Sequence, residues 1–198
     1  MSKPFDARLA CWLVGPLARS AVSPNHLTTL RLITGLYGAA LLAAGDANLA
    51  GASLVVLSNF LDHTDGELAR LTGKQSRFGH NFDLLADALV TSLLFVGLGL
   101  GLRDTLGNSS LALGVVAGAA VAGIFHLRNS LEITHGKEAT RQPHWSGFEA
   151  EDVLYLLPAI AALGALEWFL RAAAVGAPIA LVVVLLQTRA IRGGADKP

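Results

Sequence analysis

Long apolar stretches constrain this chain more than any other feature of its sequence. Six of them follow one another, each close to the roughly 17–25 residues that cross a bilayer as an α-helix: Leu27–Ala44, Leu49–Leu71, Phe82–Leu102, Leu111–Leu131, Val153–Leu170 and Ala177–Ile191. Hydrophobic residues make up 53% of the sequence and charged residues 15%, whereas soluble domains carry about 25% charged residues. Because 198 residues cannot bury that much apolar surface by themselves, the bilayer is the natural solvent for the chain.

We therefore predict an all-α, polytopic membrane protein with six transmembrane helices. No period-2 alternation suggests a membrane β-barrel, and no linker or repeat divides the chain, so residues 1–198 are expected to form one domain. Within it, the six-span bundle covers residues 23–193 and a short tail covers 194–198. The single Cys11 excludes a disulfide framework. A net charge of zero gives no bulk attraction for nucleic acid, and we expect no nucleic-acid partner.

The first 22 residues are too charged to span a membrane. Their apolar positions recur at helical spacing, as at Phe5, Leu9 and Trp12, between basic and acidic residues. This pattern predicts an amphipathic helix over residues 1–22 that lies in the membrane interface. A signal peptide is the alternative, but the segment lacks an uninterrupted apolar core.

The basic residues predict the orientation of the six spans. Thirteen lie at one side of the expected bundle: Lys3, Arg8, Arg19, Arg31, Arg70, Lys74, Arg77, Arg128, Lys137, Arg141, Arg189, Arg192 and Lys197. Only Arg103 and Arg171 lie at the other side, in the short connections 103–109 and 171–176. Since cytoplasmic loops carry the excess of Lys and Arg, we expect both termini and the charged loops in the cytoplasm.

Four aspartates stand where the second and third spans meet at this side. Asp62 and Asp65 share a face with Gly66 and Ala69, at i, i+3, i+4 and i+7 of one helix. Gly79, Asp83 and Asp87 share a face of the next helix, and the loop between them lets the helices run antiparallel. Each charged side chain at membrane depth costs about 2.5–3.5 kcal/mol on insertion scales. Such a cluster requires a polar cavity with compensating positive charge.

The residue types at this cluster predict a metal site that binds a diphosphate. Ligands that are all oxygen suit Mg²⁺, Mn²⁺ or Ca²⁺ better than zinc, and Mg²⁺ held by few carboxylates usually takes phosphate oxygens as further ligands. Gly66, Ala69 and Gly79 leave room for a ligand to approach closely. Arg70 beside them is suited to a forked contact with phosphate.

The same residues form the pattern D-x2-D-G-x2-A-R-x8-G-x3-D-x3-D over residues 62–87. This pattern resembles, without departure, the signature of the CDP-alcohol phosphotransferases. Eight specified positions make a chance match improbable, on the order of one in 10¹⁰ per start position. The segment Ser23-Pro24-Asn25-His26-Leu27-Thr28 before the first span also looks like the usual entry of this family. With the six-span plan, the resemblance extends over nearly the whole chain.

The resemblance implies an integral membrane transferase that displaces CMP from a CDP-linked donor with an alcohol. It implies two divalent cations, Mg²⁺ or Mn²⁺, held by Asp62, Asp65 and Asp83 with Asp87 also in the metal shell. Asp87 is further implied as the catalytic base for the acceptor hydroxyl. The implied CDP-binding positions are Gly66, Ala69, Arg70 and Gly79, with Asn25 and Thr28 as additional members. Membrane lipids are expected partners, and a homodimer is kept as a candidate assembly.

Several features keep two readings open. The aspartates could instead form a solvated ion network with Arg70, Lys74 and Arg77. Seven glycines are expected to serve helix packing: Gly38, Gly97, Gly99, Gly101, Gly114, Gly118 and Gly123. Five residues near the end of the fourth span either belong to the excess of basic residues on the cytoplasmic side or bind an acceptor phosphate: His126, Arg128, His135, Lys137 and Arg141. An acidic group either compensates a helix dipole or recognises the acceptor: Glu149, Glu151 and Asp152.

The donor and the functional class carry alternatives as well. The short chain is similar to the bacterial members of the family, which favours CDP-diacylglycerol as donor and the bacterial inner membrane as location. The alternative within the family is a CDP-headgroup donor with a lipid alcohol acceptor. Outside it, a small divalent-cation or proton transporter also explains intramembrane carboxylates, although transporters scatter charges between repeats. A catalytically silent lipid-binding member is a third hypothesis, against which the intact motif speaks.

Overall fold

The computed structural model describes residues 14–135 and 150–195. Every regular element in these two ranges is a helix, which confirms the all-α class. The elements are α2 (Pro24–Ala44), α3 (Asn48–Thr72), α4 (Arg77–Gly101), α5 (Arg103–Leu106), α6 (Ser109–His135), η1 (Ala150–Leu156), α7 (Leu157–Ala162) and α8 (Leu166–Ala195).

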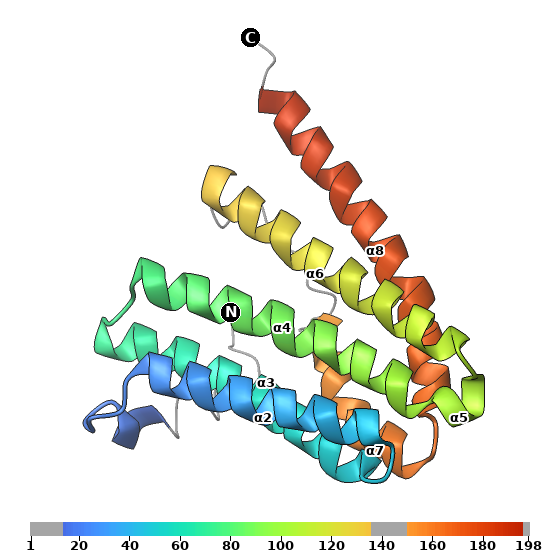
Figure 1. Ribbon diagram of the computed structural model, residues 1–198. Coiled ribbons are helices and arrows are strands. Elements are labelled where there is room, and N and C mark those ends of the chain that lie inside the picture. The colour runs from blue at the N-terminus through green and yellow to red at the C-terminus, as the bar shows by residue number, and fades with distance from the viewer. Residues whose placement is uncertain (1–13, 136–149, 196–198) are drawn as a thin grey trace.

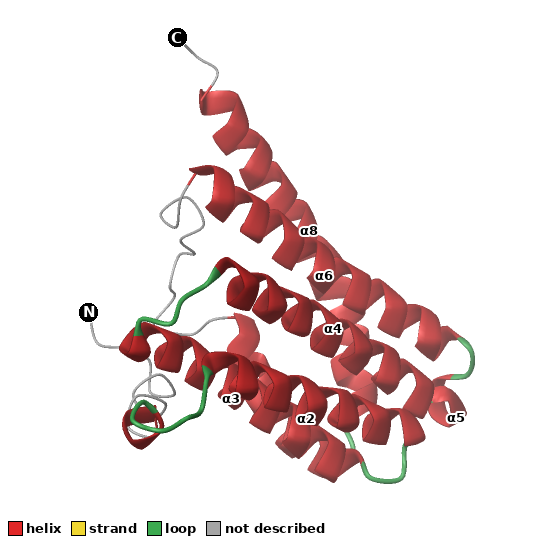
Figure 2. Cartoon of the chain, turned by 60° about the vertical axis from the view of Figure 1, so that its left-hand side comes forward, coloured by secondary structure: helices red, strands yellow, loops and turns green. Residues whose placement is uncertain are grey.

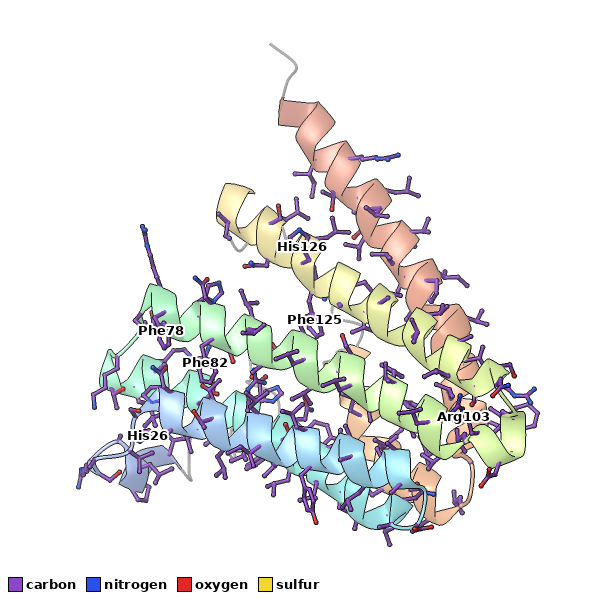
Figure 3. All side chains as sticks on the ribbon, viewed as in Figure 1. His26, Phe78, Phe82, Arg103, Phe125 and His126 are labelled. Atoms are coloured by element: carbon purple, nitrogen blue, oxygen red, sulfur yellow. The ribbon has the colours of Figure 1, made fainter. Side chains whose placement is uncertain are left out.

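The long helices lie beside one another as an up-and-down bundle (Figure 1). Helix α2 packs against α3 and α4, α4 packs against α6, and α6 packs against α8, while α7 covers α3. Figure 2 shows the short connections gathered at the two ends of the bundle. His26, Phe78 and Phe82 mark one end, where α2 begins, α3 ends and α4 begins, and Arg103 marks the opposite end (Figure 3). We call the first of these the charged end.

Four helical segments are long and apolar enough to cross a membrane: Pro24–Ala44, Arg77–Gly101, Ser109–Leu131 and Leu166–Ile191. Helix α3 is as long as α4, with 25 residues each. Its second half, however, carries Asp62, Asp65, Glu67 and Arg70, and this charge separates it from the four apolar segments. The first four expected spans thus coincide with α2, α3, α4 and α6.

The expected boundaries of the fifth and sixth spans are wrong. Residues 153–170 do not form one helix, because α7 ends at Ala162 and Gly164 adopts a left-handed conformation with a φ of 66°. Helix α8 then runs for 30 residues straight through the expected loop at 171–176. The one charged residue of that stretch, Arg171, forms an ion pair of 2.6 Å with Glu167, four residues earlier on the same helix. The expected polar connection is therefore part of a helix.

Small residues bring the helices into close contact. A Cβ atom at Gly38 would lie 2.8 Å from the carbonyl oxygen of Gly51 on α3, and one at Gly97 would lie 2.5 Å from that of Ala39 on α2. At Gly114 on α6 a Cβ atom would collide with the carbonyl oxygen of Phe95 on α4. The other predicted packing glycines, Gly99, Gly101, Gly118 and Gly123, also face a neighbouring helix. The packing role of all seven is confirmed.

The predicted interfacial helix falls mostly outside the described residues. Its described part is helical over residues 14–17. Val14 is buried there and packs with Leu27 of α2 and Leu68 of α3. This contact ties the segment before α2 to the charged end of the bundle.

Candidate metal and diphosphate site

Helix termini place the motif residues opposite one another at the charged end. Helix α3 ends at Thr72 and is followed by Gly73, which adopts a φ of 64° that few other residues tolerate. Ser76 then caps α4, since its side-chain oxygen accepts a hydrogen bond of 3.0 Å from the backbone N–H of Gly79. Helix α2 begins after Ser23 with Pro24 in its first turn, where the missing N–H is tolerated. The last turns of α3 therefore face the first turns of α4 and α2.

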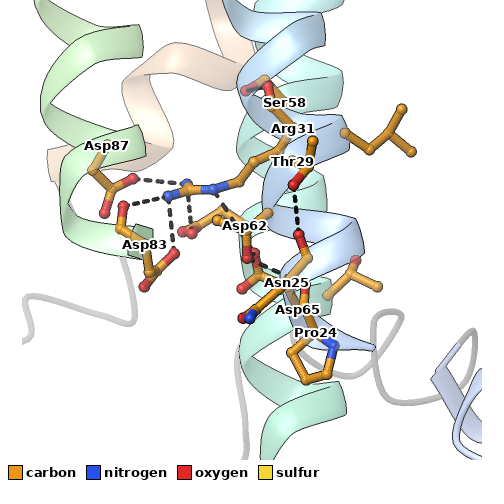
Figure 4. Close-up of polar contacts among 12 residues, drawn as sticks. Pro24, Asn25, Thr29, Arg31, Ser58, Asp62, Asp65, Asp83 and Asp87 are labelled. Carbon is orange, nitrogen blue, oxygen red and sulfur yellow. Dashed lines mark hydrogen bonds and ion pairs between the residues drawn. The ribbon is translucent and has the colours of Figure 1, made fainter. Parts of the chain in front are cut away.

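The two acidic faces meet as the spacing predicts. Carboxylate oxygens of Asp62 on α3 and of Asp83 and Asp87 on α4 all lie within 4.8 Å of one another. All three side chains are partly buried. Figure 4 shows them converging from two helices on one point of the bundle. Three carboxylates this close together require positive charge beside them.

Arg31 occupies the centre of this cluster. Its Nη1 atom lies 2.6 Å from Asp62 Oδ1 and 2.8 Å from Asp87 Oδ1, and its Nη2 atom lies 2.9 Å from Asp83 Oδ1. The side chain is only 3% exposed, and Figure 4 shows its guanidinium between the carboxylates. Arg31 was expected only as one of the basic residues that set the topology, and its place in the cluster was not predicted. The signal was available, since an arginine inside an apolar span normally has a charged partner.

Asp65 lies at the edge of the cluster and is held from α2. Its Oδ2 atom accepts a hydrogen bond of 2.7 Å from the hydroxyl of Thr28 and lies 3.8 Å from Nε of Arg31. Both Asp65 and Thr28 are buried. Asn25, one turn before Thr28, approaches α4, because a Cβ atom at Gly79 would lie 3.1 Å from its Oδ1. The predicted entry segment thus borders both acidic helices.

Space beside the cluster remains at Gly66. A Cβ atom there would meet only the guanidinium of Arg70, at 3.6 Å. Arg70 is 57% exposed and pairs with the buried Glu67 at 3.1 Å. Ala69 on the same helix is partly exposed. Gly66 and Ala69 therefore leave an accessible surface next to an arginine, as a phosphate ligand requires.

The residues of the cluster fit a divalent cation. Four carboxylates surround a single guanidinium, so the ionised cluster keeps an excess of three negative charges. Every acidic ligand atom is an oxygen, which suits Mg²⁺, Mn²⁺ or Ca²⁺. Further positive charge would relieve the repulsion that Arg31 only partly balances.

The residues considered for the acceptor are described only in part. Arg128 lies on α6 and lines a cavity next to Asp87. His126, on the same helix, is exposed (Figure 3). The expectations for Lys137, Arg141 and Glu149 fall outside the described residues, and those for His135, Glu151 and Asp152 concern side chains that the structure does not describe.

Fold and site together define a class: a polytopic membrane protein with a carboxylate cluster, fit for divalent metal, at one end of its bundle. Comparison with known families narrows this class. A model of the CDP-alcohol phosphatidyltransferase family matches residues 21–187. The chain belongs to this family.

Two curated relatives are similar to part of the chain. The bifunctional IPC transferase and DIPP synthase of Rubrobacter xylanophilus is 40% identical over 100 residues, which are 48% of this chain and 23% of the relative. The archaetidylinositol phosphate synthase of Pyrococcus horikoshii is 38% identical over 85 residues, 43% of this chain and 45% of the relative. The matches thus span less than half the length of either relative.

Solved structures share the fold over nearly the full chain. Phosphatidylinositol phosphate synthase PgsA1 of Mycobacterium tuberculosis with CDP-DAG bound superposes with a TM-score of 0.72 at 21% identity, covering 91% of this chain and 94% of that one. The same enzyme in complex with manganese and citrate gives a TM-score of 0.71 at 20% identity, covering 90% and 88%. At this identity the likeness shows a common fold.

Proposed function

We propose that this protein transfers a phosphate-linked group from a CDP-linked donor to an alcohol, with release of CMP, and that CDP-diacylglycerol is the donor. The observation that carries the proposal is the convergence of Asp62, Asp83 and Asp87 within 4.8 Å at the place where the family motif predicts it. The fold shared with a synthase that binds CDP-DAG supports this choice of donor. The family contains both donor types, so a CDP-headgroup donor is the alternative that the experiment below includes.

Each motif residue receives a role in this proposal. Asp62, Asp65, Asp83 and Asp87 hold the divalent cations, Mg²⁺ or Mn²⁺. Divalent cations held by these residues would supply positive charge that neutralises the diphosphate and the departing CMP. Gly66, Ala69 and Gly79 admit the CDP moiety, Arg70 contacts its phosphates, and Asn25 and Thr28 border the same pocket. The manganese complex of the structural neighbour is consistent with this metal choice.

Asp87 is the proposed general base. The acceptor oxygen attacks the β-phosphorus and forms a new P–O bond, while the bond from that phosphorus to the oxygen of CMP breaks. The proton of the acceptor hydroxyl passes to the Asp87 carboxylate, and CMP leaves with the bridging oxygen. A carboxylate within hydrogen-bond reach of the hydroxyl is sufficient for this proton transfer.

The test is CMP release from the purified protein in lipid nanodiscs with Mg²⁺ or Mn²⁺. One arm combines CDP-diacylglycerol with glycerol, glycerol 3-phosphate, inositol phosphate or serine, and the other combines CDP-headgroup donors with diacylglycerol. We expect CMP and a phosphodiester lipid in the first arm. Asp83→Asn should abolish both products, while Asp46→Asn, an exposed aspartate in the loop after α2, should not. Absence of CMP in every arm would refute the proposal.

We further propose that the chain crosses the membrane six times, with the charged end in the cytoplasm of a bacterium. The crossings would be α2, α3, α4, α6, η1 with α7, and α8. Alternation of the helix ends between the two ends of the bundle supports this order (Figures 1 and 2), as does the excess of basic residues at one side. A reporter fused to the C-terminus should read as cytoplasmic. A periplasmic reading would refute the orientation.

A further inference from the structure

A cavity of about 460 Å³ lies beyond Asp87, on the side of α4 that faces α6 and α8. Helix α3 contributes Asn59 to its wall, and η1 contributes Val153 and Leu154. Its volume falls within the roughly 300–1,000 Å³ of typical ligand pockets. Because Asp87 belongs both to the carboxylate cluster and to this wall, a molecule in the cavity would reach the proposed catalytic base directly.

The wall of the cavity has two parts of different chemistry. Four polar residues line it: Asn59, Asp87, Thr91 and Arg128. The rest of the wall is aliphatic, aromatic or glycine, with Phe95, Phe125 and Phe169 as its largest side chains. A polyol that filled this space would place most of its hydroxyl groups against carbon, where unpaired polar groups are costly.

Helix α8 makes the cavity long. Its lining residues follow one face from Phe169 to Val184, a distance of about 22 Å at 1.5 Å per residue. Five successive positions on this face, 172, 173, 176, 177 and 180, are alanine or glycine, so the helix leaves room along much of that length. Phe125, on the opposite wall, lies on α6 (Figure 3). An extended chain fits this shape better than a compact headgroup.

One polar group in the wall lacks a partner. The side-chain nitrogen of Asn59 is buried and makes no hydrogen bond within the part of the chain that the structure describes. Buried amide donors are nearly always paired in folded proteins. Since Asn59 precedes Asp62 by about one turn of α3, its N–H groups are available to a ligand oxygen beside the carboxylate cluster.

We propose that the acceptor is an alcohol that carries an aliphatic chain, with the chain in this cavity and the hydroxyl at Asp87. This inference rests on the proposed transferase function and involves the same bond changes, with no additional reactant. The donor approaches from the other side of α4, because Asn25, Gly66 and Gly79 lie where α2, α3 and α4 meet. Donor and acceptor would thus reach Asp87 from its two sides.

The first experiment varies the chain of the acceptor. CMP release from CDP-diacylglycerol is measured with glycerol and with 1-O-alkylglycerols of two to eight carbons, beside the water-soluble alcohols named above. Each methylene that leaves water for an apolar site should raise kcat/KM by about fourfold until the cavity is filled. A flat or falling series, or release with water-soluble alcohols alone, would overturn the inference while leaving the transferase function intact. No CMP with any alcohol would instead refute the function itself.

The second experiment fills the cavity. Ala173→Phe and Ala177→Phe place a ring on the lining face of α8, and Val182→Phe places the same ring on an exposed position of that helix as the matched control. The first two variants should lower kcat/KM for octylglycerol by about tenfold or more. The KM for CDP-diacylglycerol should stay within twofold in both variants, and Val182→Phe should keep the activity of the unaltered protein with octylglycerol and with glycerol.

The same variants separate the two sources of an aliphatic chain. A raised KM for CDP-diacylglycerol with an unchanged preference among acceptors would assign the cavity to a donor chain and overturn the inference. An unchanged unfolding temperature serves as the check on folding. If either variant fails to fold, the chain-length series on the unaltered protein decides alone.

Discussion

The two sides of α4 differ in chemistry and in packing. On the side of α2 and α3, Asp83 and Asp87 meet a buried arginine and two further carboxylates, and Gly97 lets the backbones of α2 and α4 touch. On the side of α6 and α8, the same Asp87 borders a long cavity with a mostly apolar wall. The first side is a compact charged cluster and the second is open space.

This difference separates two requirements of a transferase. The reaction needs charged groups whose positions are fixed to within a few tenths of an ångström. The closely packed helices α2, α3 and α4 can provide such fixed positions. Selection among alcohols needs a space whose size and polarity can change without disturbing those groups. The contrast teaches that donor chemistry and acceptor choice are served by different helices, with Asp87 at their boundary.

Removal of metal should have the largest effect, because the donor phosphates are held through the cations of the charged side. Chelation with EDTA should abolish CMP release, and added Mg²⁺ or Mn²⁺ should restore it. The reason is the excess negative charge around Arg31, which one guanidinium does not balance. Full activity in EDTA would remove the metal from the account.

Substitutions of the aspartates should divide the cluster by role. Asp62→Asn, Asp65→Asn and Asp83→Asn should weaken metal and donor binding together, since the phosphates are held through the cations. Asp87→Asn should mainly reduce turnover, by about 10²–10⁴-fold, because a general base is needed most in the transition state. Binding of a CDP analogue and single-turnover rates are measured side by side. Normal turnover of Asp87→Asn, or loss of donor binding equal to that of Asp62→Asn, would withdraw the base assignment.

Loss of Arg31 should destabilise the charged side before any reaction occurs. Arg31→Gln leaves four carboxylates without their common partner, and breaking a buried ion pair costs about 3–5 kcal/mol. We expect a lower unfolding temperature in EDTA and a larger rise on addition of Mn²⁺ than in the unaltered protein. Arg31→Lys keeps the charge without the forked geometry, so its unfolding temperature should lie between those of Arg31→Gln and the unaltered protein. Equal responses to Mn²⁺ in all three proteins would contradict a counter-ion role.

The smallest effect is expected at Gly66. An alanine there meets only the mobile end of Arg70, at 3.6 Å, so the stability of the protein should change by less than about 1 kcal/mol. The extra methyl group fills the surface assigned to the CDP moiety and should weaken binding of a CDP analogue by about tenfold. Thermal unfolding and calorimetric titration of the same sample check both statements. Unchanged affinity would place the nucleotide elsewhere.

The charged side could be predicted well from the sequence, because its information is local. The spacing of Asp62, Asp65, Asp83 and Asp87 along two helices already fixes which faces meet. Arg31 was missed because its carboxylate partners are 31 to 56 positions away in the sequence. Its position in an apolar span was read as topology, whereas the need to neutralise a charge there pointed to a partner.

The side of α4 that faces α6 and α8 depends on long-range packing and could not be predicted to the same extent. The break at Gly164 was missed because residues 153–170 form one apolar stretch in the sequence, and the connection was expected only at 171–176. The i,i+4 spacing of Glu167 and Arg171 suits a helix that runs through this expected connection. The small residues of α8 resemble those that pack helices together elsewhere in the chain. Only the distances between α4, α6 and α8 decide that they border a cavity.

The central claim is that these aspartates hold divalent metal for a CDP-linked donor, and anomalous scattering tests it most directly. Crystals grown with Mn²⁺ and a CDP analogue are measured at the manganese absorption edge. The account predicts an anomalous peak within ligand distance of Asp62, Asp83 and Asp87, on the side of α4 that faces α2 and α3. No peak there, or one confined to other residues while the CDP analogue is bound, would contradict it.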